Sequence, residues 1–461
     1  MKPIIMDFDY NSDIPLYIQL YRSVRDDIIS GDLKEGEKLP SLRTLAKNLD
    51  ISITTTQLAY NQLLVEGYIE SKPQSGYYVA RVISIKEDDS DAALHNPLTL
   101  SSANPKSSSH IFDPECFDFI KWKKCASGIF NDYSDLLLYE SDPQGEYSLR
   151  YEISKYIYSS RGVSASPEQI VIGAGTQQIT GHLCRILGKM NINHVSLEKP
   201  GYLPVQSMFF EQGMTISHIP VKADGIEISK LPANIASAVY VSPSNQFPTG
   251  AVMPAGRRYQ LLEWAKDNDS IIIEDDYDSE LRYFGKPVPA LKSLDKSNRV
   301  VYLGSFSSTL FPAIKISYMV LPYPMVEIFD EIKSQYTQTC SKAEQLTLAL
   351  FMEKGYYYTG IRKLRNLYSQ KLQTTIQSFS AHGEGRISAR NTQSGMNLII
   401  RVRSKKSADE LCNLAKSIGL QMVPVADISD QETSALIFYY NQIPLSQIDS
   451  LVKQLVKNWN L

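Results

Sequence analysis

Five polar segments in the C-terminal part of the chain carry residues that could bind a small ligand. They are GAGTQQ (173–178), EKPGY (198–202), SPSNQFPTG (242–250), DDYD (275–278) and GSFSST (304–309). Hydroxyls, carboxylates and the backbone N–H groups of glycine-rich turns are the groups with which proteins fix a polar ligand. Each segment alone also has an ordinary explanation. A single tyrosine usually packs in a core, and the acidic run 274–278 could be a solvated loop or a magnesium site.

The apolar runs before these segments indicate the elements that must position them. From about residue 112 onward, short β-branched runs alternate with longer helical stretches, which is typical of a mostly parallel sheet covered on both faces. Ligands bind at the carboxyl ends of such strands, so we expect the polar segments to converge on one pocket. From about residue 340, helices and a few strands predict a smaller C-terminal α+β lobe. The six runs are 169–173, 194–198, 238–242, 270–275, 300–304 and 316–321.

Residues 12–81 show a different pattern. Apolar residues recur every four positions from 16 to 28 and predict a helix that ends near residue 31. Ser41 and Ser52 can each cap a further helix, the second of which runs to about residue 66. Two short runs at 68–71 and 77–79 predict a hairpin. This order of elements is that of a winged helix-turn-helix.

Composition places the chain among multidomain globular proteins. It has 461 residues, of which 43% are hydrophobic and 21% are charged. Residues 82–111 are rich in Ser, Asn and Asp and predict a flexible linker. The first residues lack the pattern of a secretory signal, and the five cysteines are scattered without a CxxC pair. We therefore expect a cytoplasmic protein with free thiols and no metal site.

The charge of the N-terminal unit counts against strong non-specific binding to nucleic acid. Residues 1–80 contain eight Lys and Arg but eleven Asp and Glu. Non-specific binding depends on the neutralisation of phosphates. A DNA-binding function must therefore be argued from the motif.

The segment 36–79 resembles the GntR-type winged helix-turn-helix domain over nearly its whole length. The similar positions include Leu39-Pro40-Ser41, Leu45-Ala46 and Glu66-Gly67. The resemblance implies that polar residues at helix starts contact phosphates, that longer side chains reach base edges, and that a glycine lets the wing approach the backbone. Ile53 departs from the family, which usually has an Arg there, so the affinity could depend on a dimer with two half-sites. The implied DNA-binding residues are Ser41, Arg43, Ser52, Thr54, Thr55, Gln57 and Gly76.

Residues 112–461 resemble fold-type I, pyridoxal-phosphate-dependent aminotransferases, and specifically the sensor domain of MocR-type regulators. The segments YESDPQGEYSLR (139–150), GAGTQQ, EKPGY, EDDYDSELRY and GSFSSTLFPAIKISY occur in the order of that family. The resemblance implies that one group of residues binds the phosphate and that another contacts the pyridine ring, with the carboxylate on the ring nitrogen. The implied cofactor residues are Gly175, Thr176, Gln177, Ser305 and Lys315 for the phosphate, and Tyr202, Asp275 and Tyr277 for the ring.

Ser308 departs from the family at the position that decides catalysis. In these proteins the motif that corresponds to GSFS is followed by the lysine that holds the aldehyde of pyridoxal phosphate and moves the proton. A serine hydroxyl cannot form that bond and is a poor base near neutral pH. Lys315 is seven residues away and is assigned to the phosphate. The stretch ALIFYYNQ (435–442) also lacks the Arg that binds the substrate carboxylate, for which Arg401 and Arg403 are possible replacements.

These features predict a homodimeric transcriptional regulator that binds double-stranded operator DNA and has a non-catalytic, aminotransferase-like sensor. Pyridoxal phosphate or a related vitamer would bind non-covalently, if it binds at all. Two alternatives remain open, namely a ligand-free dimerisation scaffold and an active aminotransferase with a DNA-binding appendage. The sequence identifies neither the operator nor the effector.

Overall fold

The structure is a computed structural model that describes residues 6, 8–9, 14–73, 75–80, 116–283, 289–391, 393–425 and 432–461. Contacts divide the chain into two compact units, 1–103 and 104–461. The predicted linker 82–111 lies outside the described residues. No helix among the described residues is long and apolar enough to cross a membrane.

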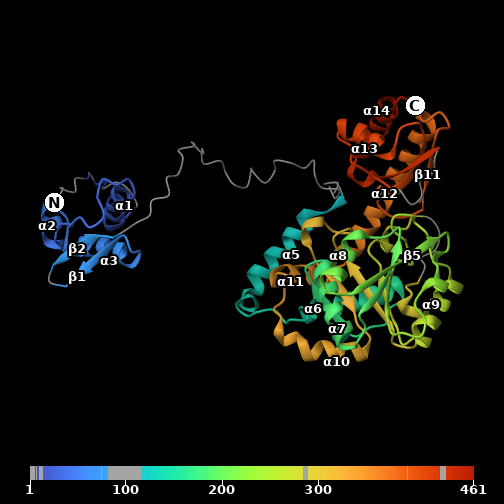
Figure 1. Cartoon of the computed structure of the whole chain (residues 1–461), viewed down its shortest axis with the longest axis horizontal. Coiled ribbons are helices and arrows are strands. Elements are labelled where there is room, and N and C mark those ends of the chain that lie inside the picture. The colour runs from blue at the N-terminus through green and yellow to red at the C-terminus, as the bar shows by residue number, and fades with distance from the viewer. Residues whose placement is uncertain are drawn as a thin grey trace. The chain divides into compact units, whose positions relative to one another are not determined.

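The N-terminal unit is a three-helix core closed by a hairpin (Figure 1). Leu20, Val24, Leu45 and Leu63 are fully buried in its core. The second and third helices begin with the predicted serine caps. Ser41 Oγ accepts a hydrogen bond from the N–H of Thr44, and Ser52 Oγ accepts one from the N–H of Thr55. Its elements are α1 (Leu16–Ile29), α2 (Leu42–Asn48), α3 (Ile53–Val65), β1 (Ile69–Lys72) and β2 (Gly76–Val79).

The C-terminal unit is built on an eight-stranded sheet with the order β3-β10-β9-β8-β7-β4-β5-β6. All strands run parallel except β10 and the short β6, so the predicted mostly parallel sheet is confirmed. The strand β5 was not among the six predicted runs. Its alternation of polar and apolar residues fits a position near the edge of the sheet. The strands are β3 (Ile170–Gly173), β4 (His194–Lys199), β5 (Thr215–Lys222), β6 (Gly225–Ile226), β7 (Ala238–Val241), β8 (Ile271–Asp275), β9 (Val300–Ser305) and β10 (Ser317–Val320).

Helices cover both faces of this sheet. Alternate residues of β7 separate the two layers: Ala238 and Tyr240 pack toward α7, α8 and α10, whereas Val239 and Val241 pack toward α9. α5, α6 and α11 join the second layer over β3 and β10. The fully buried β-branched runs therefore arise because neither face meets water. The helices are α5 (Phe119–Asp132), α6 (Tyr147–Arg161), α7 (Thr176–Lys189), α8 (Leu203–Glu211), α9 (Ala255–Asp267), α10 (Tyr323–Ile332) and α11 (Lys342–Glu353).

A smaller lobe follows, drawn in orange and red in Figure 1. Its four-stranded antiparallel sheet has the order β11-β12-β14-β13, and three helices cover one face. The predicted lobe 340–461 also includes α11, which packs against the large sheet. The elements of the lobe are α12 (Tyr356–His382), β11 (Ile387–Arg390), β12 (Leu398–Arg403), α13 (Ala408–Ser417), β13 (Met422–Pro424), β14 (Thr433–Phe438) and α14 (Ile448–Trp459).

Candidate functional site

The carboxyl ends of the parallel strands bring most of the predicted cofactor residues to one edge of the large sheet. Strand pairing places Ser317 of β10 between Gly173 of β3 and Ser305 of β9. Asp275 is the last residue of β8 and pairs with Leu303 of β9. Ser305 and Asp275 therefore lie on neighbouring strands, and the helix that follows Gly173 begins beside them.

The start of α7 offers unsatisfied donors at this edge. Gly175 precedes the helix with φ +86°, a conformation that favours glycine, and no side chain caps the helix. Thr176 and Gln177 are its first residues, and Gln177 is exposed. The first N–H groups of a helix lack partners within the helix and favour an anion. The Ser305 hydroxyl lies nearby and accepts a hydrogen bond from the Ser317 hydroxyl at 3.0 Å.

Asp275 is buried at the same edge, at the end of β8. Tyr240 donates its phenolic hydrogen to Asp275 Oδ2 at 2.6 Å. Burial raises the pKa of Asp275 to about 7, against the opposing effect of the Tyr240 hydrogen bond. A cation placed beside this carboxyl would favour its charged form. Tyr202, which directly precedes α8, is 42% exposed, and its ring lies 6.4 Å from that of Phe247.

The acidic run is a buried network, in contrast to the solvated loop considered above. Glu274 accepts from the backbone N–H groups of residues 291 and 292, both at 2.7 Å. Asp276 forms an ion pair with Arg161 at 2.7 Å, and Asp278 accepts from the Asn245 amide. These carboxylates orient the loop that follows β8.

Ser308 lies in the loop after β9, where its hydroxyl is engaged. Ser308 Oγ donates to the backbone carbonyl of Tyr277 at 2.7 Å. The Tyr277 hydroxyl in turn donates to the carbonyl of Asn245 at 3.2 Å. Lys315 is exposed and has a left-handed backbone with φ +47°. Position 308 therefore joins two loops of the site through a neutral hydrogen bond.

The two arginines that could replace the missing carboxylate ligand lie on β12. Arg401 is half-buried and donates to Thr433 Oγ1 at 2.8 Å, whereas Arg403 is exposed. Arg401 shares a sheet face with Ile399, which packs in a small cluster that includes Phe247. Arg403 shares this face, and Arg401 is the nearer of the two along the strand to Ile399.

The predicted DNA-binding residues lie along α2, α3 and the hairpin. Arg43, Thr54 and Gln57 are exposed, and Thr55 is half-buried next to its cap. The hydroxyls of Ser41 and Ser52 serve as caps and also remain on the surface. Ile53, where the family usually has Arg, is 50% exposed.

Comparison with known proteins agrees with this division of the chain. Residues 16–79 match the family "Bacterial regulatory proteins, gntR family", and residues 113–428 match "Aminotransferase class I and II". The HTH-type transcriptional regulator YdeL of Bacillus subtilis is 37% identical over 97% of this chain and 98% of its own length. The probable rhizopine catabolism regulatory protein MocR of Rhizobium meliloti is 31% identical over 91% of this chain and 88% of its own length.

The chain belongs to the MocR-type family of HTH transcriptional regulators. Among solved structures, the kynurenine aminotransferase of Pyrococcus horikoshii is similar with a TM-score of 0.66 and 24% identity. The match covers 79% of this chain and 93% of that one. This similarity shows the aminotransferase fold of the C-terminal unit. The predicted winged helix fused to a fold-type I domain is confirmed.

The structure of this MocR-type regulator adds two cations to the predicted DNA-binding surface. Lys38 and Lys72 lie over the ring of Tyr78, with Nζ 5.8 Å and 4.7 Å from its centroid. Tyr78 pairs across the hairpin with Glu70, close to Gly76, whose φ is +114°. The sequence counts both lysines but does not place them, because the register of the hairpin positions Lys72 and a separate bridge to Tyr78 positions Lys38.

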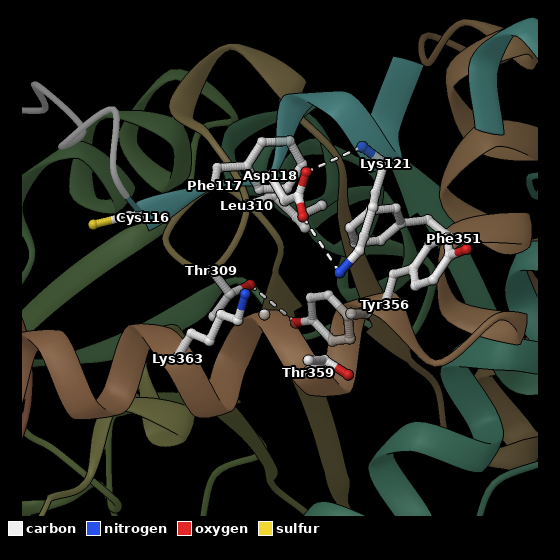
Figure 2. A pocket seen from close by; sticks show the side chains of 12 residues that line it. Cys116, Phe117, Asp118, Lys121, Thr309, Leu310, Phe351, Tyr356, Thr359 and Lys363 are labelled. Carbon is white, nitrogen blue, oxygen red and sulfur yellow. Dashed lines mark hydrogen bonds and ion pairs between the residues drawn. The ribbon is translucent and has the colours of Figure 1, made fainter. Parts of the chain in front are cut away.

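A small pocket lies beside the loop that carries Ser308 (Figure 2). Thr309 and Leu310 line it, as do Phe117 and Asp118 at the start of the described part of the C-terminal unit. None of the predicted cofactor residues is among those that line this pocket.

Proposed function

We propose that the regulator responds to a small ligand and that its sensor domain binds this ligand without transamination. The observation that carries the proposal is the hydroxyl of Ser308, which donates to the Tyr277 carbonyl where the family has an amine. A neutral hydroxyl in this bond neither attaches to an aldehyde nor removes a proton from a bound amine near neutral pH. The loss of acid–base function alone would reduce the rate by about 10²–10⁴-fold.

The remaining residues fit pyridoxal phosphate or a related vitamer. The uncapped start of α7 with Gly175, Thr176 and Gln177, together with Ser305 and Lys315, would hold the phosphate. Tyr202, Asp275 and Tyr277 would contact the ring. When bound, the cofactor supplies an electron sink, which depends on a protonated ring nitrogen. The Asp275 carboxyl would keep that nitrogen protonated.

For the N-terminal domain, which we place at 12–81, we propose binding to operator DNA in the cytoplasm. Hydroxyl and N–H groups at the starts of α2 and α3, including Ser41, Ser52, Thr54 and Thr55, would contact phosphates. Arg43 and Gln57 would reach bases or phosphates, and Gly76 would let the wing approach the backbone. We place the linker at 82–111 and the sensor domain at 112–461. The sensor domains would form a homodimer, which would allow two winged-helix domains to bind two half-sites of the operator.

Support for a homodimer comes from a large aromatic surface on the sensor. Large apolar side chains on α5, on α6 and on the turn 134–138 between them are exposed, and Ile120 and Leu138 each reach 83%. Exposed apolar side chains that lie together mark interaction surfaces. A second copy fits best because a fold built for a shared site would cover the same patch on each partner. The other exposed members include Phe119, Phe130, Tyr133, Leu136, Tyr139, Tyr147, Tyr151 and Tyr158.

Titration with pyridoxal phosphate, followed by borohydride reduction and mass analysis, tests the sensor. We expect saturable binding to the wild-type protein without a retained adduct. The Ser308→Lys variant, which restores the amine, should retain the cofactor mass after reduction, and Ser307→Lys serves as its control. A wild-type adduct that disappears in Lys315→Ala would overturn the proposal. Failure to bind would instead favour a ligand-free scaffold.

Binding to operator DNA tests the proposed role of the winged-helix domain. Arg43→Ala should weaken the affinity and lower the slope of log K against log salt by about one, because one phosphate or base contact is lost. Arg43→Lys keeps the charge and should retain most of the slope. Equal affinity and slope in Arg43→Ala and the wild-type protein would reject this docking of α2.

A further inference from the structure

A row of arginines lies at the edge of the small-lobe sheet, on the face that also carries Ile399. β11 is the edge strand and pairs with β12 so that Ser388 lies beside Arg401 and Arg390 beside Ile399. The N–H of Arg403 donates to the carbonyl of Arg386 at 2.8 Å, which continues the same pairing. We call Arg386, Arg390, Arg401 and Arg403 the arginine stripe.

The stripe occupies the face that the helices of the lobe leave uncovered. The alternate residues Ile387, Ala389, Ile400 and Val402 pack into the core formed with α12, α13 and α14. Because side chains alternate across a strand and paired residues share a face, the four arginines lie on the opposite side. Ser388 and three of the arginines are exposed, and Arg401 is half-buried.

The charged side chains that the strands place on this face are all basic. The strands β11 to β14 contain no Asp or Glu, and the nearest acids in sequence among the described residues are Glu384 and Glu432. Within the described part of the chain, no acidic side chain pairs with Arg386, Arg390 or Arg403. Charges on an edge strand also prevent aggregation, but charges of either sign serve that purpose. The three exposed arginines, Arg386, Arg390 and Arg403, therefore favour binding of an anion.

We propose that the arginine stripe contacts the phosphate backbone of duplex DNA, in addition to the winged helix. The spacing suits an extended polyanion, because Arg401 and Arg403 are about 6.6 Å apart along the strand and Arg386 and Arg390 about 13 Å. The N-terminal unit is net acidic and has Ile53 where the family usually has Arg. The stripe supplies phosphate contacts that this unit lacks, and arginine is suited to phosphate geometry.

The test compares two triple variants of the full-length protein. Arg386→Gln, Arg390→Gln and Arg403→Gln remove three charges from the stripe. Lys266→Gln, Lys416→Gln and Lys453→Gln remove three charges from exposed positions on α9, α13 and α14. The probe is a duplex of about 40 base pairs with random sequence, because phosphate contacts do not depend on sequence. Its dissociation constant is measured at several salt concentrations.

The stripe variant should bind at least about tenfold more weakly at low salt, and its salt slope should fall by about two to three relative to the control variant. Replacing the same arginines with lysine should preserve most of the slope. The same loss should appear in an Arg43→Ala background, which separates the stripe from the winged helix. Equal binding by the two triple variants would overturn the proposal, and so would a wild-type protein with no salt-dependent binding. Tighter binding by the stripe variant would also overturn it, because the arginines would then oppose binding of the duplex.

Discussion

At position 308, the residue on which the family's chemistry depends is replaced while the fold is kept. The loops after β8 and β9 are joined by the Ser308–Tyr277 hydrogen bond, beside the residues that we predict to hold a phosphate and a ring. A serine can hold two loops together, but the family's chemistry depends on an amine. The residue that decides the reaction is thus not one that the fold requires.

A second residue, Glu198, makes the site sensitive to pH. Its Oε2 accepts from the Ser242 N–H and from Gln246, and its Oε1 has no partner among the described residues. Burial, followed by smaller effects that include the repulsion of Asp275, raises the pKa of Glu198 from 4.5 to about 8. The folded protein therefore holds a proton between these pH values that the unfolded chain has lost. The ionisation of Glu198 lowers stability as the pH rises through this window.

Glu198→Gln removes this ionisation and keeps the shape of the side chain. Between pH 5.5 and 8.5 the free energy of unfolding of the variant should rise by about 3 kcal/mol relative to the wild-type protein. Denaturant unfolding at the two pH values measures the difference. The control Glu263→Gln, at an exposed position on α9, should show almost none. A pH-independent difference for Glu198→Gln would mean that Glu198 stays charged when folded.

At the scale of elements, an aromatic cluster ties the first helix of the sensor to the loop after β9. The ring of Phe311 lies 5.0 Å from that of Phe117 and 5.4 Å from those of Phe119 and Trp122. Phe311 follows Ser308 by three residues, so the loop that carries the site also anchors the start of α5. Edge-to-face ring pairs contribute about 0.5–1.5 kcal/mol each beyond burial.

Phe311→Ala should therefore lower the free energy of unfolding of the sensor by about 2–3 kcal/mol, since the ring is half-buried. Amide exchange at residues 117–122 should increase in the folded state. Phe130→Ala, on the exposed side of the same helix, should cost less than about 1 kcal/mol. If exchange at 117–122 were unchanged, the cluster would not hold the start of α5.

At the scale of the whole molecule, the exposed surface on α5, α6 and the turn between them predicts self-association. Leu138→Asp together with Tyr158→Glu places charges in this surface and should raise the dimer dissociation constant by about 100-fold or more. Size-exclusion chromatography with light scattering measures the change. Phe210→Glu on α8, where the ring is 73% exposed, is the matched control. Equal dissociation of both variants would place the interface elsewhere.

Much of this architecture could be predicted because its signals are local. The serine caps of α2 and α3, the buried runs of the large sheet and the order of the polar segments depend on short stretches of chain. The strand β5 was missed because a polar and apolar alternation near a sheet edge is a weaker signal than a continuous buried run.

The sequence by itself determined that the chain joins a winged helix to an aminotransferase-like domain and that position 308 carries a hydroxyl, because side-chain chemistry and periodicity are local properties. Only the tertiary structure decided that the acidic run is buried, that Lys38 and Lys72 meet at Tyr78, and that four arginines share one face of a sheet. Strand register and burial arise from contacts between distant parts of the chain, and a single sequence does not encode these contacts at short range.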